Sequence, residues 1–369
     1  MSKIRRALGL MSGTSMDGID IALIETDGGT HVRRMEAVSV AYPEDFRGRL
    51  RQALADALQV KASLDRPGCL ADVERELTER HAEAVHRFIG DHEVQPGTID
   101  VIGFHGQTVL HRPGDGITVQ LGDGALLARA TGIDVVYDMR AADVASGGEG
   151  APLAPAYHRA LAARLPQRPC VFLNIGGVAN VTWVGADETL VAFDTGPGNA
   201  MLDDLVLRLA GATRDEDGKL AAAGKIDEQI VHAYLMHPYF AKPVPKSLDR
   251  NAFAAELVDG LPVEDAAATL TAFTVEAIVK GRAHMPAEPA LWVVCGGGRR
   301  NRTLMHMLAA RVENAVVPAE AVGLDGDTLE AEAWAYLAVR SLDRLAISWP
   351  TTTGVAAPAS GGVLARASG

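Results

Sequence analysis

The sequence predicts an α/β protein of two lobes, and three glycine-rich turns carry that prediction. Each turn follows an apolar run that is typical of a buried strand, and together they occur in both halves of the chain. Backbone N–H groups in such turns can hold phosphate oxygens, and glycine leaves room for the close approach. The set indicates a nucleotide gripped by both lobes, and the alternative is three ordinary strand–helix corners. The turns lie at residues 13–18, 174–177 and 296–298.

The length of the chain favours two domains. It has 369 residues, whereas single hydrophobic cores stop growing near about 250–300 residues. A proline-containing stretch near residue 166 offers a boundary. We therefore expect an N-terminal lobe of residues 1–165 and a C-terminal lobe of residues 166–369, with the last helix and the tail closing the cleft.

The first half of the chain predicts a sheet with helices after it. Residues 7–11 and 19–24 pair as a hairpin around the first turn, because the second run alternates polar and apolar residues. Around residues 70–88 apolar side chains recur on one face of a helix and charged ones on the other. The other expected elements are strands at 33–41, 101–104 and 133–137, a short helix at 122–131 and a helix after the loop at 146–155.

The second half repeats this pattern, which indicates a duplicated fold. A strand at 171–173 leads into the second turn, and a strand at 178–184 returns from it. The tail after residue 344 is rich in Pro, Thr, Ser, Gly and Ala, so it is either partly disordered or packed back as a strand. The remaining expected elements are strands at 190–193 and 291–294, a helix from residue 301 and a helix at 327–344.

Composition argues against several classes of protein. The formal net charge of −12 disfavours a nucleic-acid partner, because counterion release requires clustered Lys and Arg. No apolar run reaches about 18 residues and the N-terminus lacks the apolar core of a signal peptide, so we expect no membrane span. Cys69, Cys170 and Cys295 lack metal-ligand spacing and fit a reducing compartment. We therefore expect a cytoplasmic protein.

The first turn carries both hydroxyls and carboxylates. Ser12, Thr14 and Ser15 suit a phosphate, whereas Asp17 and Asp20 would repel it. Mg²⁺ between the phosphate and the carboxylates, bound largely through water, would resolve the conflict. The alternative is a turn held by its own Asx and Ser/Thr hydrogen bonds.

Seven motifs together give the chain a specific resemblance. Their sequences, and the order in which they occur over nearly the whole chain, resemble those of the anhydro-N-acetylmuramic acid kinase family. The resemblance implies a two-lobed actin/hexokinase-like ATPase fold with mixed sheets and with ATP in the interdomain cleft. The motifs are GLMSGTSMDGID at 9–20, GFHGQT at 103–108, TVQLG at 118–122, the segment 143–152, NIGG at 174–177 with Asn180, FDTGPGN at 193–199 and CGGG at 295–298 with Asn301.

The resemblance also implies a reaction. The family opens the 1,6-anhydro ring of anhydro-N-acetylmuramic acid and phosphorylates the sugar, giving the 6-phosphate and ADP. The biological setting is the recycling of murein, the bacterial wall polymer. ATP and Mg²⁺ are the implied cofactors, the amino sugar is the implied partner, and the family tends to form homodimers.

The resemblance assigns the glycine-rich turns to ATP. The first turn would hold the β- and γ-phosphates, and the second would approach them from the other lobe. The third would pass under the adenosine, where a side chain would collide with the base or the ribose. The three sets are Gly13, Thr14, Ser15, Met16, Asp17, Gly18, Ile19 and Asp20; Asn174, Gly176 and Gly177; and Gly296, Gly297 and Gly298.

One carboxylate is the candidate catalytic base. A 1,6-anhydro sugar has no free 6-hydroxyl, so water must attack the anomeric carbon before the freed oxygen takes the phosphoryl group. A single well-placed carboxylate can activate that water. Asp194 ends a buried strand and opens a Gly-Pro-Gly turn, and by resemblance it matches the family's base. The alternative is an aspartate that caps the helix at residue 199.

Sugar recognition is expected in the first lobe. Arg140 is the candidate cation for the lactyl carboxylate, because a guanidinium can pair with it bidentately. Asp143 would orient Arg140 or a sugar hydroxyl. By resemblance Glu330 faces the sugar, although on the sequence alone it is equally an exposed helical charge. The other candidates are polar residues at or near strand ends, which suit the paired donors and acceptors of a saccharide site: His105, Gln107, Thr108 and Gln120.

Three departures from the family pattern bear on these expectations. The pair at 141–142 is Ala-Ala where some relatives carry arginines, and Glu149 stands where glutamine is frequent. Both put sugar affinity in doubt rather than the reaction. Leu10 occupies the place of an aspartate that many hexokinase-type proteins carry before the turn, which leaves the metal ligands open.

Three other functions compete with this interpretation. Another small-molecule kinase of the same superfamily would phosphorylate an ordinary sugar such as glucose or glucosamine. A nucleotide-dependent binding protein of the actin or chaperone type would need partner-binding insertions, for which the chain has no room. A Rossmann dehydrogenase would need Gly-x-Gly-x-x-Gly at a helix start and an acidic residue about 20 positions on, and the sequence lacks that spacing.

Overall fold

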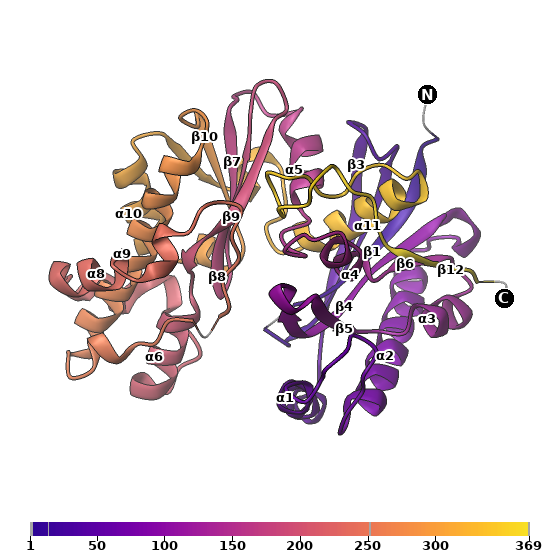
Figure 1. Ribbon diagram of the computed structural model, residues 1–369, viewed down its shortest axis with the longest axis horizontal. Coiled ribbons are helices and arrows are strands. Elements are labelled where there is room, and N and C mark those ends of the chain that lie inside the picture. Colours follow the sequence, from indigo (N-terminus) through magenta and orange to yellow (C-terminus); the bar gives the residue numbers. More distant parts are fainter. Residues whose placement is uncertain (1–2, 14, 251, 368–369) are drawn as a thin grey trace. The chain divides into compact units, whose positions relative to one another are not determined.

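A computed structural model describes residues 3–13, 15–250 and 252–367 (Figure 1). The chain divides into two compact units. The first is Met1–Arg164 together with Thr328–Gly369, and the second is Leu165–Asp327. Within the described residues, no helix combines the length and the apolar character needed to cross a membrane.

The first unit is built on a mixed sheet with the strand order β12-β6-β4-β1-β2-β3, and β5 pairs with β4. The pairs β1–β2 and β2–β3 are antiparallel, whereas β1–β4 and β4–β6 are parallel. The strands are β1 (Arg5–Ser12), β2 (Gly18–Thr26), β3 (Val32–Ala41), β4 (Val101–Arg112), β5 (Ile117–Leu121), β6 (Val135–Tyr137) and β12 (Val363–Ala365).

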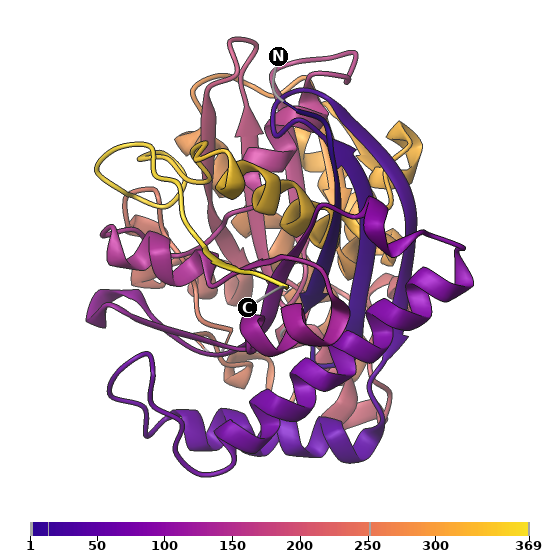
Figure 2. The same ribbon diagram turned by 90° about the vertical axis from the view of Figure 1, so that its right-hand side faces the viewer.

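Helices cover both faces of this sheet, and the side-chain alternation of β1 shows how. Leu8 and Leu10 belong to the core shared with α1 (Glu44–Ala57), α2 (Leu70–Asp91) and α3 (Gly124–Thr131). On the opposite face a Cβ on Gly9 would collide with the Ala331 carbonyl of α11 (Leu329–Leu342), and one on Gly103 would collide with Trp334. The ribbon shows helices around the strands of this sheet (Figure 2), and a strand that is covered on both faces has a continuous apolar run, as β1 does at residues 7–11. The unit also contains α4 (Met139–Ala145) and α5 (Pro155–Ala162).

The second unit repeats the arrangement in a sheet of order β11-β10-β7-β8-β9. Again two antiparallel hairpin pairs lie on one side of the central strand and two parallel pairs on the other. The strands are β7 (Cys170–Ile175), β8 (Val178–Val184), β9 (Leu190–Pro197), β10 (Leu291–Cys295) and β11 (Ala315–Pro318). The helices are α6 (Ala200–Ala210), α7 (Lys219–Ala223), α8 (Glu228–Leu235), α9 (Val263–Gly281) and α10 (Arg302–Val312).

The repeated strand order confirms the duplicated fold and the predicted α/β class. Both sheets are mixed, and each unit is an antiparallel three-strand hairpin continued by parallel strands, as in the actin/hexokinase-like ATPase fold. In the second unit α9 is apolar nearly all round and packs against the sheet and its neighbouring helices, because it lies in the core. Short 3₁₀ turns complete the chain at Pro96–Thr98, Pro113–Asp115, Glu216–Gly218, Pro238–Ala241, Glu256–Val258, Arg282–His284, Gly297–Arg300 and Ala319–Val322.

Two expectations about the chain's organisation differ from the structure. The expected C-terminal lobe of residues 166–369 loses its last segment, because α11 packs against β1, β2 and β4 and so belongs with the first unit. The absence of side chains at Gly9 and Gly103 allows this packing. The tail follows one of its two expected alternatives, because residues 363–365 pack back as the strand β12, which pairs with β6 in antiparallel fashion.

The second expectation that differs concerned the strand at 101–104, which was predicted to end before His105. Instead β4 continues to Arg112. Its pairing with β1 shifts between Leu10 and Ser12, which leaves one extra residue in β4. Gly106 takes a φ of +71° there, and a bulge of this kind lets the strand continue while re-aiming its polar side chains.

Candidate functional site

The first glycine-rich turn joins β1 to β2 at the carboxyl end of β1. The Ser15 hydroxyl donates to Asp17 Oδ1 at 2.7 Å, and the Met16 N–H donates to the Gly13 carbonyl at 3.1 Å. Gly18 is required by packing, because a Cβ there would collide with Val40. The Ile19 side chain is buried in the core, so its backbone alone could face a ligand. Thr14 lies outside the described residues.

Buried side chains support this turn from β4. The Ser12 hydroxyl donates to Gln107 Oε1 at 2.7 Å, and Gln107 Nε2 donates to the Gly13 carbonyl at 3.0 Å. The Tyr42 hydroxyl lies 2.9 Å from Ser12 Oγ, and burial raises the pKa of Tyr42, so it remains a neutral donor. Gln107 is 1% exposed. Its amide is therefore committed to the turn, whereas the sequence suggested a contact with the sugar.

His105 and Arg140 form a second buried arrangement beside Ser12. Arg140 Nε donates to His105 Nε2 at 3.0 Å, and His105 Nδ1 lies 3.2 Å from the Ser12 carbonyl. Burial, with the Arg140 charge, holds the pKa of His105 well below its usual value. The imidazole is therefore neutral, with its proton on Nδ1. Both groups also contact Trp334: its ring lies 4.6 Å from that of His105 and 5.2 Å from the guanidinium.

Asp143 acts on Arg140 through a loop rather than directly. Its Oδ2 accepts from the Gly150 N–H at 2.7 Å, and its Oδ1 accepts from the Thr353 hydroxyl at 2.8 Å. The Gly150 carbonyl in turn accepts from Arg140 Nη1 at 2.9 Å. Asp143 is 2% exposed, so it orders the loop that orients the guanidinium.

Thr108 and Gln120 pair across the β4–β5 hairpin. Gln120 Nε2 donates to the hydroxyls of Thr108 (3.1 Å) and Thr118 (2.9 Å). Gln120 Oε1 is buried and has no hydrogen-bond donor among the described residues, so it is an acceptor that a ligand could satisfy. Glu330 lies in the first turn of α11, one helical turn before Trp334, where desolvation by the surrounding protein raises the pKa of its carboxyl and the charge of Arg140 partly opposes this shift.

The second unit brings its own predicted residues together at the carboxyl ends of the parallel strands β7 and β10. The Gly198 N–H donates to the Gly177 carbonyl at 2.9 Å, and the Asn199 N–H donates to Gly176 at 2.7 Å. A Cβ on Gly198 would collide with the Gly176 carbonyl. The loop after β9 and the turn after β7 therefore form one hydrogen-bonded unit.

The third turn closes on the second. Gly296 has a φ of +72°, and a Cβ there would collide with Asn174. Gly298 faces Ile175 in the same way. Arg299, which sequence reasoning missed, is almost fully buried: it donates to the Gly296 carbonyl at 2.9 Å and pairs with Glu320 and Asp327. It thus fixes the turn from behind.

Asp194 lies within β9 rather than at its end. Its Oδ2 accepts from the Leu248 N–H at 2.7 Å, and its backbone pairs with Asn180 on β8. The register shifts next to this pair, which leaves Thr195 as the extra residue of a bulge, a feature that often re-aims a side chain beside an active site. The N-cap of α6 is Asn199, so the capping alternative for Asp194 does not hold.

The site includes several residues that the sequence did not single out. Trp334, Thr353, Tyr42, Tyr239, Lys246 and Arg299 all contact predicted residues. No sequence signal marks the first five, because each of their contacts joins segments far apart in the chain, whereas Arg299 directly follows the third turn and contacts Gly296 three residues before it. Over the described part of the chain, no group of three or more His, Cys, Asp or Glu could hold a metal ion.

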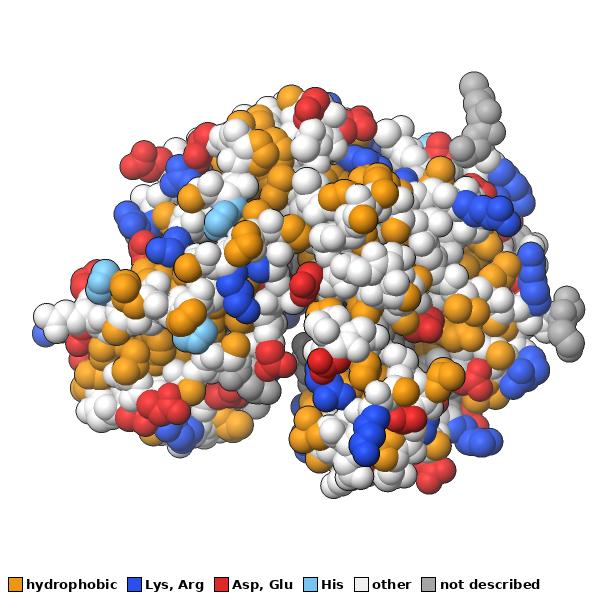
Figure 3. All heavy atoms as spheres, in the orientation of Figure 1, with side chains coloured by type: hydrophobic (Ala, Val, Ile, Leu, Met, Phe, Trp, Pro, Cys, Tyr) orange, Lys and Arg blue, Asp and Glu red, His pale blue; other side chains and the backbone are white. Residues whose placement is uncertain are grey.

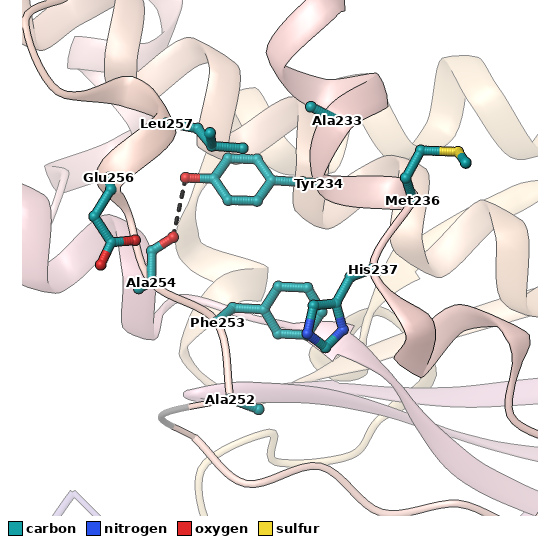
Figure 4. Close-up of a pocket in the computed structure, with 9 residues that line it drawn as sticks. All are labelled: Ala233, Tyr234, Met236, His237, Ala252, Phe253, Ala254, Glu256 and Leu257. Atoms are coloured by element: carbon teal, nitrogen blue, oxygen red, sulfur yellow. Dashed lines mark hydrogen bonds between the residues drawn. The ribbon is translucent and has the colours of Figure 1, made fainter.

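One cavity lies apart from these residues, and the surface charges are mixed. A cavity of about 350 Å³ in the second unit is lined by α8 and residues 252–257, with Tyr234, His237 and Phe253 among its walls and no predicted site residue (Figure 4). On the face seen in Figure 3, Lys and Arg side chains are scattered among Asp and Glu rather than gathered into one basic patch.

Comparison with known proteins gives one consistent result. The family model described as anhydro-N-acetylmuramic acid kinase matches residues 5–367. The chain is 52% identical over 373 residues to the anhydro-N-acetylmuramic acid kinase of Brucella canis, covering 99% of this chain and 100% of that one. The corresponding protein of Rhodospirillum rubrum is 54% identical over 361 residues, with 96% and 93% coverage.

Solved structures resemble the chain more distantly. Component A of (R)-2-hydroxyglutaryl-CoA dehydratase from Acidaminococcus fermentans is 9% identical, with a TM-score of 0.48 and coverage of 92% and 99%. A ROK family glucokinase from Streptomyces griseus is 12% identical, with a TM-score of 0.40 and coverage of 90% and 99%. These likenesses are too distant to assign a function. The match over nearly the full length, at more than half identity to the curated relatives, confirms the resemblance, and the chain belongs to the anhydro-N-acetylmuramic acid kinase family.

Proposed function

We propose that this chain opens the 1,6-anhydro ring of 1,6-anhydro-N-acetylmuramic acid and phosphorylates O6, using ATP. The products are N-acetylmuramic acid 6-phosphate and ADP, and the setting is murein recycling in the cytoplasm. The chain's place in the kinase family supports the reaction class. The family tendency to form homodimers carries over as an expectation that light scattering can test.

The observation that carries the proposal is a set of glycines that the protein itself does not require. The nearest atom to a Cβ would lie 3.6 Å away at Gly13 and Gly177 and 3.7 Å away at Gly176 and Gly297, which is ordinary contact distance. No positive φ is needed at these positions either. Glycine there leaves room for a ligand to approach the backbone closely, as phosphates require, and the Gly176 N–H itself donates to the Val178 carbonyl at 3.2 Å.

The three turns then divide the nucleotide between them. Gly13 and the backbone from Ser15 to Asp20 hold the β- and γ-phosphates from the first unit, and Thr14 is assigned with them. Asn174, Gly176 and Gly177 contact the phosphates from the second unit. Gly296, Gly297 and Gly298 lie under the adenosine, on a turn that Arg299 holds rigid.

The donor set of the first turn fits Mg²⁺ that keeps most of its water. Asp17 and Asp20 each accept a short hydrogen bond from a serine hydroxyl, Ser15 to Asp17 and Ser39 to Asp20, so both carboxyl groups are oriented at the turn. One or two carboxylates with phosphate and water are the usual Mg²⁺ environment. When bound with ATP, Mg²⁺ would neutralise charge on the phosphates.

Asp194 is the proposed general base. It takes a proton from water as the water oxygen bonds to C1 of the sugar, the C1–O6 bond breaks, and O6 takes the γ-phosphoryl group. The Leu248 N–H fixes one carboxylate oxygen and so sets the direction of the other. Such positioning matters because proton transfer needs hydrogen-bond distance in the bound complex.

Arg140 is the proposed partner of the lactyl carboxylate. Its guanidinium is held by His105, by the Gly150 carbonyl and against Trp334, so its planar fork is oriented before the sugar binds. Two arginines that some relatives carry next to it are alanines here, so Arg140 makes this contact without them. His105 and Asp143 then act on the sugar through Arg140, whereas Gln107 acts on the first glycine-rich turn.

Thr108, Gln120 and Glu330 are proposed to contact the sugar directly. The buried Gln120 Oε1 needs a donor, and the acetamido N–H or a hydroxyl of the sugar can supply one. Glu330 is exposed on the same helix as Trp334 and can accept from a further hydroxyl.

The proposal is tested by turnover in ¹⁸O-labelled water. ATP and the anhydro sugar should give ADP and a 6-phosphorylated reducing sugar with label at C1. Label found in phosphate alone would contradict the ring opening. Equal phosphorylation of glucosamine or of the open-ring sugar would instead favour an ordinary sugar kinase.

A further inference from the structure

A buried lysine, Lys246, lies on the loop that contacts the proposed base. Lys246 is 7% exposed and follows η4 (Pro238–Ala241) on a loop that runs alongside β9. A lysine is rarely buried to this extent without a partner or a purpose.

Residues 239–248 form hydrogen bonds with three atoms of Asp194. The Asp194 N–H donates to the Lys246 carbonyl at 3.0 Å, and the Leu248 N–H donates to Asp194 Oδ2 at 2.7 Å. From the other side the Tyr239 hydroxyl donates to the Asp194 carbonyl at 2.5 Å. Backbone and carboxylate of the same residue are therefore held together by residues 239–248.

Lys246 links this loop to the aromatic ring of Tyr239. Its Nζ donates to the Tyr239 carbonyl at 3.2 Å and lies 4.5 Å from the centroid of the Tyr239 ring, a cation–π contact. The Tyr239 ring is itself packed edge-on against Phe240 and Phe253, and Phe253 forms a wall of the cavity in Figure 4. The ammonium thus ties the loop to an aromatic support.

The charged groups around Lys246 favour an ionised Asp194. Burial lowers the pKa of Lys246, the charges of Lys280 and Lys242 lower it further, and the Asp194 carboxylate raises it. The other titratable group that senses Lys246 is His284, whose pKa is lowered by burial and then by the lysine. Asp194 is the anionic group in this set, so the lysine charge acts in favour of its carboxylate form.

We infer that Lys246 and Tyr239 are positioning residues for Asp194: they hold the carboxylate in one orientation and keep a positive charge beside it. This inference rests on the proposed role of Asp194 as general base. Neither residue touches the sugar or the phosphates in this account. They act through Asp194, which stays ionised and aimed while water is activated.

The first test compares Lys246→Met with the matched control Lys242→Met. Lys242 is on the same loop and lies 5.9 Å from the same ring, but it is exposed. Lys246→Met should lower kcat about tenfold or more, leave the Kd for ATP within about twofold, and move the acid limb of the kcat–pH profile up by about 1 unit. Lys246→Arg should restore part of the loss, and Lys242→Met should match the wild type.

A second variant covers the case in which Lys246→Met does not fold. Tyr239→Phe removes the hydroxyl that donates to Asp194 and keeps the ring that supports Lys246. It should lower kcat about three- to tenfold with an unchanged acid limb, because the nearby charge remains. An unchanged kcat in both Tyr239→Phe and Lys246→Met would overturn the inference.

A double-mutant cycle separates this inference from the proposed function. Asp194→Asn should lose about 10²–10⁴ in kcat. Adding Lys246→Met to it should cost little more, since a residue that acts through Asp194 has nothing left to position. Full additivity of the two losses would sink the inference and leave Asp194 as base, whereas near-normal turnover by Asp194→Asn would sink the base assignment itself.

Discussion

The two units share a strand order but support their glycine-rich turns by different means. In the first unit the turn after β1 is supported by side chains, with Gln107 holding both Ser12 and the Gly13 carbonyl. In the second unit the turn after β7 is supported chiefly by the backbone N–H groups of Gly198 and Asn199, with one side-chain bond from Asn199 Nδ2 to the Ile175 carbonyl at 3.1 Å. The hairpin of the first unit therefore depends on a buried polar side chain, Gln107. The hairpin of the second unit depends on Gly198, where a side chain would collide with the turn.

The two units also differ in how they bury titratable groups. The first unit buries three neutral histidines: burial lowers the pKa of His81 to about 4 and that of His158 to about 3, and holds that of His105 well below its usual value. In the second unit burial lowers the pKa of His284, but that side chain is partly exposed. The first unit should therefore lose stability at a higher pH than the second unit.

The largest expected effect is a loss of stability of the first unit in mild acid. Each buried histidine has a pKa below its unfolded value, so the unfolded chain binds more protons as the pH falls below about 6.5. Each should cost about 1.4 kcal/mol per pH unit between that pH and its folded pKa. Hydrogen exchange at pH 7 and pH 5 should show β1 and β4 losing protection before β7 and β10.

Two substitutions on α2 sharpen this test. His81→Gln should flatten the pH dependence, because one buried imidazole is gone, whereas the exposed His86→Gln should leave it unchanged. Equal acid sensitivity of both units would remove the contrast.

The next largest effect is expected at Gly198. A Cβ there would collide with the Gly176 carbonyl, so Gly198→Ala forces the turn and the loop after β9 apart. We expect a loss of about 3 kcal/mol in the free energy of unfolding of the second unit. Urea unfolding measures it, and Gly177→Ala is the control, since a Cβ there has ordinary contact distances. Similar stability of the two variants would contradict the backbone support.

In the first unit the matching change is Gln107→Leu. It keeps the volume but leaves the buried Ser12 hydroxyl and the Gly13 carbonyl without their partner, which costs about 1–3 kcal/mol. The KM for ATP should rise while the KM for the sugar changes little. Gln120→Leu on the neighbouring strand should do the reverse. If Gln107→Leu raises only the KM for the sugar, Gln107 contributes to the sugar site rather than to the first glycine-rich turn.

The smallest effect is expected from filling one of the open glycine positions. Gly176→Ala should leave stability nearly unchanged, because the nearest atom to the new Cβ is 3.7 Å away. Binding of ATP should weaken about tenfold, which corresponds to about 1.4 kcal/mol, while binding of adenosine stays the same. Calorimetry measures both, with Gly48→Ala on α1 as the control, since no atom lies within 4 Å of its Cβ position. Unchanged ATP affinity would show that the glycine serves the fold.

The sequence by itself determined the strands, the three turns and the family. Apolar runs followed by glycine mark a buried strand and its corner locally, so β1, β2, β7, β8 and β10 were placed near their observed positions. Short contiguous motifs identified His105, Gln107 and Asp194 as candidate site residues, and Arg140 was identified by its guanidinium chemistry. Periodicity likewise identified the buried face of α2.

The tertiary structure alone decided which unit the last helix joins and what each polar residue contacts. The α11 backbone rests on Gly9 and Gly103, some 230–330 positions away, and no local pattern encodes that contact. The Gln107 amide contacts the first glycine-rich turn. Lys246 contacts Asp194, and Thr353 contacts Asp143, each from a distant loop. The physical reason is that a hydrogen bond depends on which segments meet in space, whereas a strand or a turn depends on the residues next to it.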